Sequence, residues 1–97
     1  MVAYAIGQLN IHSPEEYQAY LKGFLPLFQK HGGELLATTN QSTEVMEGSW
    51  AHPKTVIMRF PSLEAAHAWH DDPAYQELAE IRRRTAKTNL VIVEGLA

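Results

Sequence analysis

The sequence predicts an α+β domain of the ferredoxin-like type, with the order βαββαβ. Segments in which apolar and polar residues alternate, as in strands, are separated by segments in which apolar residues recur at helical spacing. Helix-capping residues mark where the helices begin. The 97 residues suffice for one domain only, spanning residues 1–97. The apolar fraction of 45% and the charged fraction of 20% are typical of a folded domain.

Residues 4–11 predict a strand, because apolar residues alternate there with a mixed set. Ser13 precedes Pro14, and Glu16 follows three residues after Ser13. This pattern predicts a helix start with a capping box, in which Glu16 reaches back to the Ser13 backbone.

The helix that begins there carries an apolar stripe rich in aromatic residues: Tyr17, Tyr20, Leu21, Phe24 and Phe28. Gly32 and Gly33 supply the positive φ that commonly ends a helix. Pro26 removes a backbone donor inside the helix. With Gly23 nearby, we expect a kink or a break in the last turns.

The middle of the chain predicts extended structure. Residues 34–39 form a short strand, 40–42 a polar turn and 44–47 a second extended piece. Residues 54–60 form a clearer strand, which Pro61 ends.

The second helical region is split in two. Ser62 caps one helix, and Asp72 with Pro73 starts another. Residues 89–94 then close the chain as a strand. This order matches the split-βαβ arrangement, with an antiparallel four-stranded sheet.

The face of the sheet that the helices leave open predicts a homodimer. Helices cover one face of such a sheet, and Tyr4 and Ile6 lie on the other. A second copy of the same sheet is the economical cover, because a two-fold interface needs only one self-complementary surface.

The charge pattern excludes a general polyanion binder. The formal net charge is -3 and the isoelectric point about 5.9, so nucleic acid is not an expected partner. The basic run 82–84 lies in a helical pattern, where three consecutive side chains point in different directions. We interpret the run as a solvated or salt-bridged face, with anion binding as the alternative.

Cysteine and membrane signals are both missing from the sequence. Without cysteine there are no disulfides, thiol nucleophiles or thiolate metal sites. Residues 1–4 lack a basic segment followed by an apolar stretch, and no apolar run approaches the ~18 residues of a membrane span. We expect a cytoplasmic protein without membrane contact.

Motifs along nearly the whole chain resemble one family: 31–33 (HGG), 47–50 (EGSW), 60–66 (FPSLEAA), Trp69, 72–76 (DPAYQ), 82–84 (RRR) and 93–95 (VEG). The sequence resembles the domain of unknown function 1330 family. That resemblance implies the dimeric α+β barrel, in which two ferredoxin-like sheets pack face to face, and it supplies no reaction. The sequence departs from the family at 38–40 (TTN), where an Arg-Gly-Gly turn is usual, and at His70, where Tyr is common. An anion contact by that arginine is therefore not carried over.

Two histidines are the candidate catalytic acids or bases. His12 belongs by parity with Gln8 and Asn10, which places an imidazole on the mixed face of the strand. The alternative is that His12 only precedes the cap and faces water. His70 is the second candidate base.

A metal site is not predicted. His67 and His70 are three residues apart on a helix and could share a metal with Asp71 or Asp72. No third strong ligand is identifiable, so ordinary polar roles are the preferred interpretation.

The candidate ligand-binding residues are amphipathic aromatics and one arginine: Tyr4, Tyr17, Tyr20, Trp50, Arg59 and Trp69. Core packing is the alternative for Tyr17 and Tyr20. Arg59 could neutralise an acidic substrate, or pair with Glu94 across the sheet, which is the preferred interpretation.

Two functional hypotheses follow. In the first, a pocket between sheet and helices binds or transforms a small aromatic or acidic metabolite without a cofactor, with His12 or His70 as base. In the second, the protein is a non-catalytic homodimeric interaction or structural module. The second predicts a filled core without a void of ligand size, roughly 300 Å³ or more.

Overall fold

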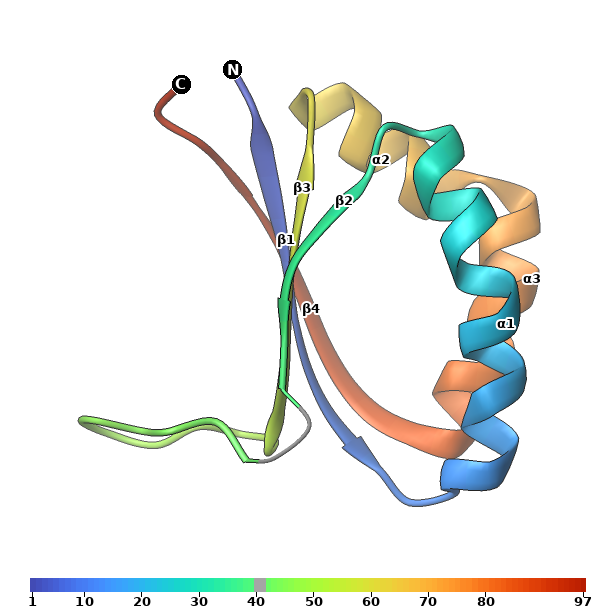
Figure 1. The fold of residues 1–97 in the computed structure, drawn as a ribbon, viewed down its shortest axis with the longest axis vertical. Coiled ribbons are helices and arrows are strands. Elements are labelled where there is room, and N and C mark those ends of the chain that lie inside the picture. Colours follow the sequence, from blue (N-terminus) through green and yellow to red (C-terminus); the bar gives the residue numbers. More distant parts are fainter. Residues whose placement is uncertain (40–41) are drawn as a thin grey trace.

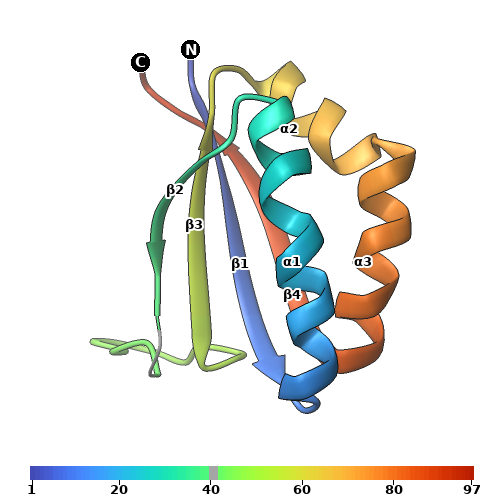
Figure 2. The same ribbon diagram turned by 45° about the vertical axis from the view of Figure 1, so that its right-hand side comes forward.

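The computed structural model describes residues 1–39 and 42–97 and shows an antiparallel four-stranded sheet with three helices on one face (Figure 1). The elements are, in chain order, β1 (Ala3–Ile11), α1 (Pro14–Lys30), β2 (Glu34–Thr38), β3 (Lys54–Phe60), α2 (Leu63–Asp71), α3 (Pro73–Thr85) and β4 (Ala86–Glu94). Their order in the sheet is β2-β3-β1-β4 (Figure 2). The predicted α+β ferredoxin-like fold, with its split second helix, is confirmed.

The central strand β1 separates the two faces of the sheet. Its burial alternates along its length, with Ala5 and Leu9 buried and Ile6 between them only half-buried. β1 pairs antiparallel with β3 on one side and with β4 on the other. The helices cover only the side of the sheet toward which Ala5 and Leu9 point (Figure 1).

Aromatic side chains fill one end of the space between the helices and the sheet. The Phe28 and Phe60 rings meet edge to face at 5.4 Å between centroids, and Trp69 and Tyr75 lie 4.4 Å apart. Each of these four side chains is 1% exposed or less. Burying one such side chain stabilises the fold by about 1.5–3 kcal/mol, so this aromatic cluster contributes substantially to the stability of the domain.

Helix α1 runs without a break through Pro26 to Lys30, so of the predicted kink or break the break is wrong, and the kink stays a prediction. Pro26 is exposed, so its missing donor concerns the outer side of the helix. Gly23 serves packing instead. A Cβ at Gly23 would lie 2.7 Å from Cδ1 of Leu78, so glycine permits the close approach of α1 and α3.

The capping box predicted at Ser13 does not form. The backbone N–H of Ser13 donates to the Thr85 carbonyl at 3.2 Å, so Glu16 cannot accept it. The Glu16 carboxylate instead accepts a hydrogen bond from the Ser13 hydroxyl, at 3.3 Å. The caps predicted at Ser62 and Asp72 are confirmed, because their side chains accept backbone N–H groups at 3.0 and 2.9 Å.

The connection between β2 and β3 differs from the expectation. Residues 44–47 form no strand, and 42–53 project from the end of the β2–β3 pair, away from the helices (Figure 1). Of the predicted polar turn, residues 40 and 41 lie outside the described residues. β4 begins at Ala86, earlier than expected, because it pairs with β1 as far as Ile11. Among the described helices, none has the length and apolarity needed to cross a membrane.

Candidate ligand-binding cavity

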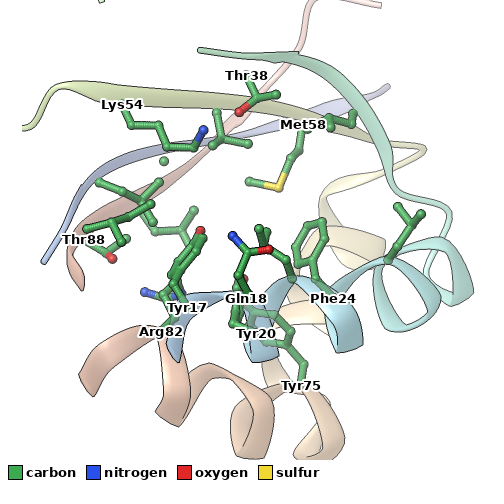
Figure 3. A pocket seen from close by; sticks show the side chains of 18 of the residues that line it. Tyr17, Gln18, Tyr20, Phe24, Thr38, Lys54, Met58, Tyr75, Arg82 and Thr88 are labelled. Carbon is green, nitrogen blue, oxygen red and sulfur yellow. The ribbon is translucent and has the colours of Figure 1, made fainter. Parts of the chain in front are cut away.

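A cavity of about 520 Å³ lies between the sheet and the two long helices, next to Trp69 and Tyr75 of the aromatic core (Figure 3). Its volume falls in the range of small-molecule sites, roughly 300–1,000 Å³. Most of its lining is apolar and comes from β1, β3, β4 and α1: Gly7, Leu9, Phe24, Val56, Met58 and Leu90. The structure therefore contains a void of ligand size within the layer where a small domain normally keeps its core.

Gly7 shows that the space above the centre of β1 is open. A Cβ added at Gly7 would meet its nearest neighbours, Leu9 and Leu90, at 3.7 and 3.9 Å. These are ordinary contact distances, so the backbone of Gly7 is not crowded by the atoms around it. The missing side chain thus contributes directly to the volume of the cavity.

Helices α1 and α3 bring a polar cluster to the cavity wall: Tyr17, Tyr20, Tyr75 and Arg82. The hydroxyls of Tyr20 and Tyr75 form a hydrogen bond of 2.8 Å. The Arg82 guanidinium carbon lies 5.9 Å from the centre of the Tyr20 ring, and Figure 3 shows Arg82 beside Tyr17. Tyr75 and Arg82 are seven residues apart on α3, two helical turns, which places both on the same side.

Tyr17 and Tyr20 of this cluster stay protonated at neutral pH. Burial raises the pKa of Tyr17 to about 12. Burial also raises the pKa of Tyr20, and the bonded Tyr75 hydroxyl raises it further. Both hydroxyls can therefore donate hydrogen bonds to a ligand, but neither is a base at neutral pH.

Arg82 remains charged in this environment. Burial by itself lowers the pKa of the guanidinium, but the neighbouring Tyr75 and Tyr20 side chains outweigh that effect and raise the pKa. The cavity wall therefore carries a fixed positive charge.

Arg82 differs from its two neighbours in the basic run. Arg83 pairs with Glu80 at 2.7 Å and Arg84 with Glu16 at 3.5 Å, both on the surface. Arg82 is only 8% exposed, and within the part of the chain that the structure describes no carboxylate forms an ion pair with it. A salt-bridged surface thus describes Arg83 and Arg84, whereas Arg82 is a buried cation without a counter-charge.

Two further polar atoms at the cavity have no hydrogen-bond partner among residues 1–39 and 42–97. They are Nε1 of Trp69, which is 1% exposed, and Oγ1 of Thr88. Both residues line the cavity. Buried polar atoms are nearly always hydrogen-bonded in folded proteins, so each of these needs an explanation.

The predicted ligand-binding residues divide between the cavity and other places. Tyr17, Tyr20 and Trp69 line the cavity. Tyr4 lies on the open face of the sheet, opposite Arg59. Trp50 lies in the 42–53 connection, where its indole N–H donates to Thr55 at 3.0 Å.

Arg59 has a partner other than the one expected. It pairs with Glu34 of the neighbouring strand β2, at 3.4 Å. The predicted pairing with Glu94 is wrong, because β1 lies between β3 and β4 in the sheet. Arg59 is exposed and does not line the cavity.

The candidate catalytic histidines both lie outside the cavity lining. His12 is exposed after β1, with its backbone N–H bound to Thr85 at 2.9 Å. His70 is half-buried at the end of α2, with Nδ1 3.7 Å from a carboxylate oxygen of Asp71. No group of three or more histidines or carboxylates suited to hold a metal ion occurs in the described residues.

Sequence reasoning missed Arg82, Tyr75 and Thr88 as cavity residues. A signal for Arg82 was present, because it follows the buried Tyr75 and the partly buried Leu78 at helical spacing. Thr88 gave no such signal, because it preceded the segment expected to form the last strand.

The family model for a domain of unknown function, DUF1330, matches residues 2–96. This chain belongs to that family. The resemblance found in the motifs is thereby confirmed over nearly the whole DUF1330 chain. No curated protein sequence matches it significantly.

Solved structures support the same fold for this DUF1330 protein. It superposes on a protein of unknown function from Rhodopseudomonas palustris with a TM-score of 0.77 and 20% identity, covering 99% of this chain and 83% of that one. A dimeric ferredoxin-like protein of unknown function from Jannaschia sp. CCS1 gives a TM-score of 0.73 with 13% identity, at 98% and 100% coverage. SnoaB, a cofactor-independent oxygenase from Streptomyces nogalater, gives 0.69 with 11% identity, at 99% and 94% coverage. At these identities the likeness concerns the fold.

Proposed function

We propose that this DUF1330 protein binds one small aromatic metabolite in the cavity between the sheet and α1, without a resident cofactor. The observation that carries the proposal is a void of about 520 Å³ with an apolar and aromatic lining and a few convergent polar groups. A filled core, the expectation for a purely structural module, does not fit this volume.

The lining favours binding over proton abstraction by the cavity wall. Of the titratable side chains there, Tyr17 and Tyr20 are protonated and Arg82 is a cation. Lys54 donates to the Thr39 carbonyl at 2.6 Å. No histidine or carboxylate is among the described lining residues, so the polar groups supply donors that orient a ligand.

Transformation of the ligand, with His12 or His70 as base, stays a separate prediction. A double variant with glutamine at both positions tests it. Unchanged turnover of an identified ligand by this variant would remove both histidines from the mechanism.

Binding can be tested with N-phenyl-1-naphthylamine, a neutral aromatic probe that fluoresces in apolar surroundings. We expect saturable binding of one probe per chain. Gly7→Leu places a side chain in the cavity at a position with room for it, so the variant should bind at least about tenfold more weakly. Ile6→Leu, one residue away on the opposite face, is the matched control and should bind normally.

Tryptophan fluorescence reports the location of the probe. Trp50→Phe leaves Trp69, which lines the cavity, as the sole tryptophan. Quenching of Trp69 should follow the same binding curve. Equal probe binding by wild type and Gly7→Leu, or no change at Trp69, would contradict the proposal.

We also propose that two copies pair through the open face of the sheet. Apolar side chains lie half-exposed or exposed there: Tyr4, Ile6, Ile57, Val91 and Val93. Val91 and Val93 are 52% and 49% exposed. A two-fold pairing would cover this self-complementary patch, and native mass spectrometry should then show twice the chain mass.

A second candidate function, a homodimeric structural module without a ligand, depends on this open face alone. The probe experiment separates the two functions. A dimer that fails to bind the neutral probe would favour the module.

A further inference from the structure

We infer that the ligand carries an anionic group, a carboxylate or comparable oxyanion, that pairs with Arg82. The inference rests on the proposed function, since it concerns the occupant of the same cavity. Its basis is the buried guanidinium of Arg82, which has no carboxylate partner in the described residues while Arg83 and Arg84 have theirs.

The groups that surround Arg82 do not neutralise it. Tyr20 is protonated and uncharged, and the Tyr20 and Tyr75 hydroxyls, which are bonded to one another at 2.8 Å, offer Arg82 hydrogen-bond acceptors but no counter-charge. A guanidinium has five N–H donors, and a buried charge without a counter-charge is unfavourable. A ligand oxyanion would satisfy both the charge and the remaining donors, and arginine suits such groups because it can bind them with two parallel hydrogen bonds.

A second hollow adds to the positive character of this site. Arg82 and Thr88 line both the cavity and an adjoining hollow of about 450 Å³ at the junction of α3 and β4. The remaining residues of that hollow are His52, Arg83, Ala86 and Lys87. Arg83 is paired with Glu80, but Lys87 adds a second positive charge beside Arg82 and no lining residue is acidic, so the local field favours an anion at Arg82.

Thr88 strengthens the assignment independently of charge. Its Oγ1 has no hydrogen-bond partner among the described residues, and it lines the same two hollows as Arg82. A hydroxyl donor near a guanidinium suits an oxyanion, which accepts from both. The unpartnered indole N–H of Trp69 offers a further donor to a polar substituent elsewhere on the ligand.

Two isosteric probes test the inference by calorimetry at pH 7. Naphthalene-2-carboxylate and naphthalene-2-carboxamide share the same ring system and differ in charge. We expect wild type to bind the carboxylate at least about tenfold more tightly than the amide, which corresponds to about 1.4 kcal/mol. Arg82→Gln should bring the ratio of the two dissociation constants close to one, whereas Arg84→Gln, at an exposed position, should preserve it.

The outcomes separate the two proposals. If wild type binds both probes equally, the anion inference is overturned while the cavity remains a binding site. If wild type binds neither probe, nor the neutral naphthylamine, the proposed function fails and the inference with it. The ratio of the two dissociation constants for wild type tests the inference without any substitution. Should Arg82→Gln not fold, Arg82→Lys keeps the charge without the planar fork, and its ratio should fall between wild type and one.

Discussion

The two faces of the sheet differ in what they leave unsatisfied. The face under the helices borders a partly open cavity and buries the cation Arg82 beside it, without a counter-charge among the described residues. The open face carries Val91 and Val93 about half-exposed to water. Two neighbouring residues of β1 lie on opposite faces: Ile6 is on the open face, and Gly7 lines the cavity. The helix-covered face holds polar groups in a buried place where apolar ones are expected. The open face exposes apolar groups to water where polar ones are expected.

Exposed apolar side chains and buried unpaired polar groups indicate where a small domain binds another molecule. Large exposed apolar patches mark interfaces, and buried unpaired polar groups mark ligand sites or cost stability. We therefore propose a ligand for the helix face and a second copy for the open face. Each interpretation can be broken by a substitution confined to one face.

The largest effect is expected on the open face, from Ile6→Lys. Ile6 lies in the middle of this face, between Ile57 on β3 and Val91 on β4. A two-fold interface would bury the new ammonium twice, without partners, which we expect to weaken dimerisation by about 4 kcal/mol or more, roughly 1,000-fold. Sedimentation velocity over a concentration series measures the change.

Gln29→Lys supplies the control for that experiment. It adds the same charge at an exposed position on α1, remote from the open face, and should leave the dimer intact. A dimer that survives Ile6→Lys would show that another surface mediates the pairing.

The sequence predicted the sheet and its two faces because these depend on local patterns. Alternation along residues 4–11 identified the buried side of β1, and the side-chain caps at Ser62 and Asp72 marked two helix starts. Residues 44–47 have an extended pattern but no neighbouring strand to pair with. A strand needs that partner, which local pattern cannot supply.

The site was only partly predictable. Its most important residue, Arg82, looks like a surface residue in the local sequence, and its burial depends on tertiary packing. A run of three arginines resembles a surface, and Arg83 and Arg84 behave accordingly. The burial of Arg82 follows from α3 packing against α1, which brings it next to Tyr20. Likewise, the choice of Glu34 over Glu94 by Arg59 depends on strand order.

On the helix face, Arg82→Met should stabilise the unliganded protein. Methionine is shorter than arginine but keeps an unbranched apolar stem, and it removes a buried, unpaired charge. Because a buried charge without a counter-charge is costly, we expect the free energy of unfolding to rise by about 1 kcal/mol or more. Urea denaturation measures the gain, and Arg84→Met, at an exposed position, should stay within about 0.5 kcal/mol of wild type. A loss of stability in Arg82→Met would mean that the guanidinium holds the fold together.

The smallest effect comes from one chemical change made on both faces. Thr88→Val replaces a hydroxyl without a described partner at the cavity by a methyl group of similar shape, and should raise the free energy of unfolding by about 0.5–1 kcal/mol. Thr55→Val, on the open side of β3, removes a hydroxyl that binds Thr43 and accepts the Trp50 indole N–H. It should lower the free energy by about 0.5–1.5 kcal/mol.

Opposite signs for these two valine variants would show that the hydroxyl at the cavity is not retained for stability. Thr88→Val should then also weaken binding of naphthalene-2-carboxylate several-fold, because the oxyanion loses one donor beside Arg82. If Thr88→Val instead destabilises the protein as much as Thr55→Val does, its hydroxyl has a structural partner. The contrast between the two faces would then rest on Arg82 and the shape of the cavity, and no longer on Thr88.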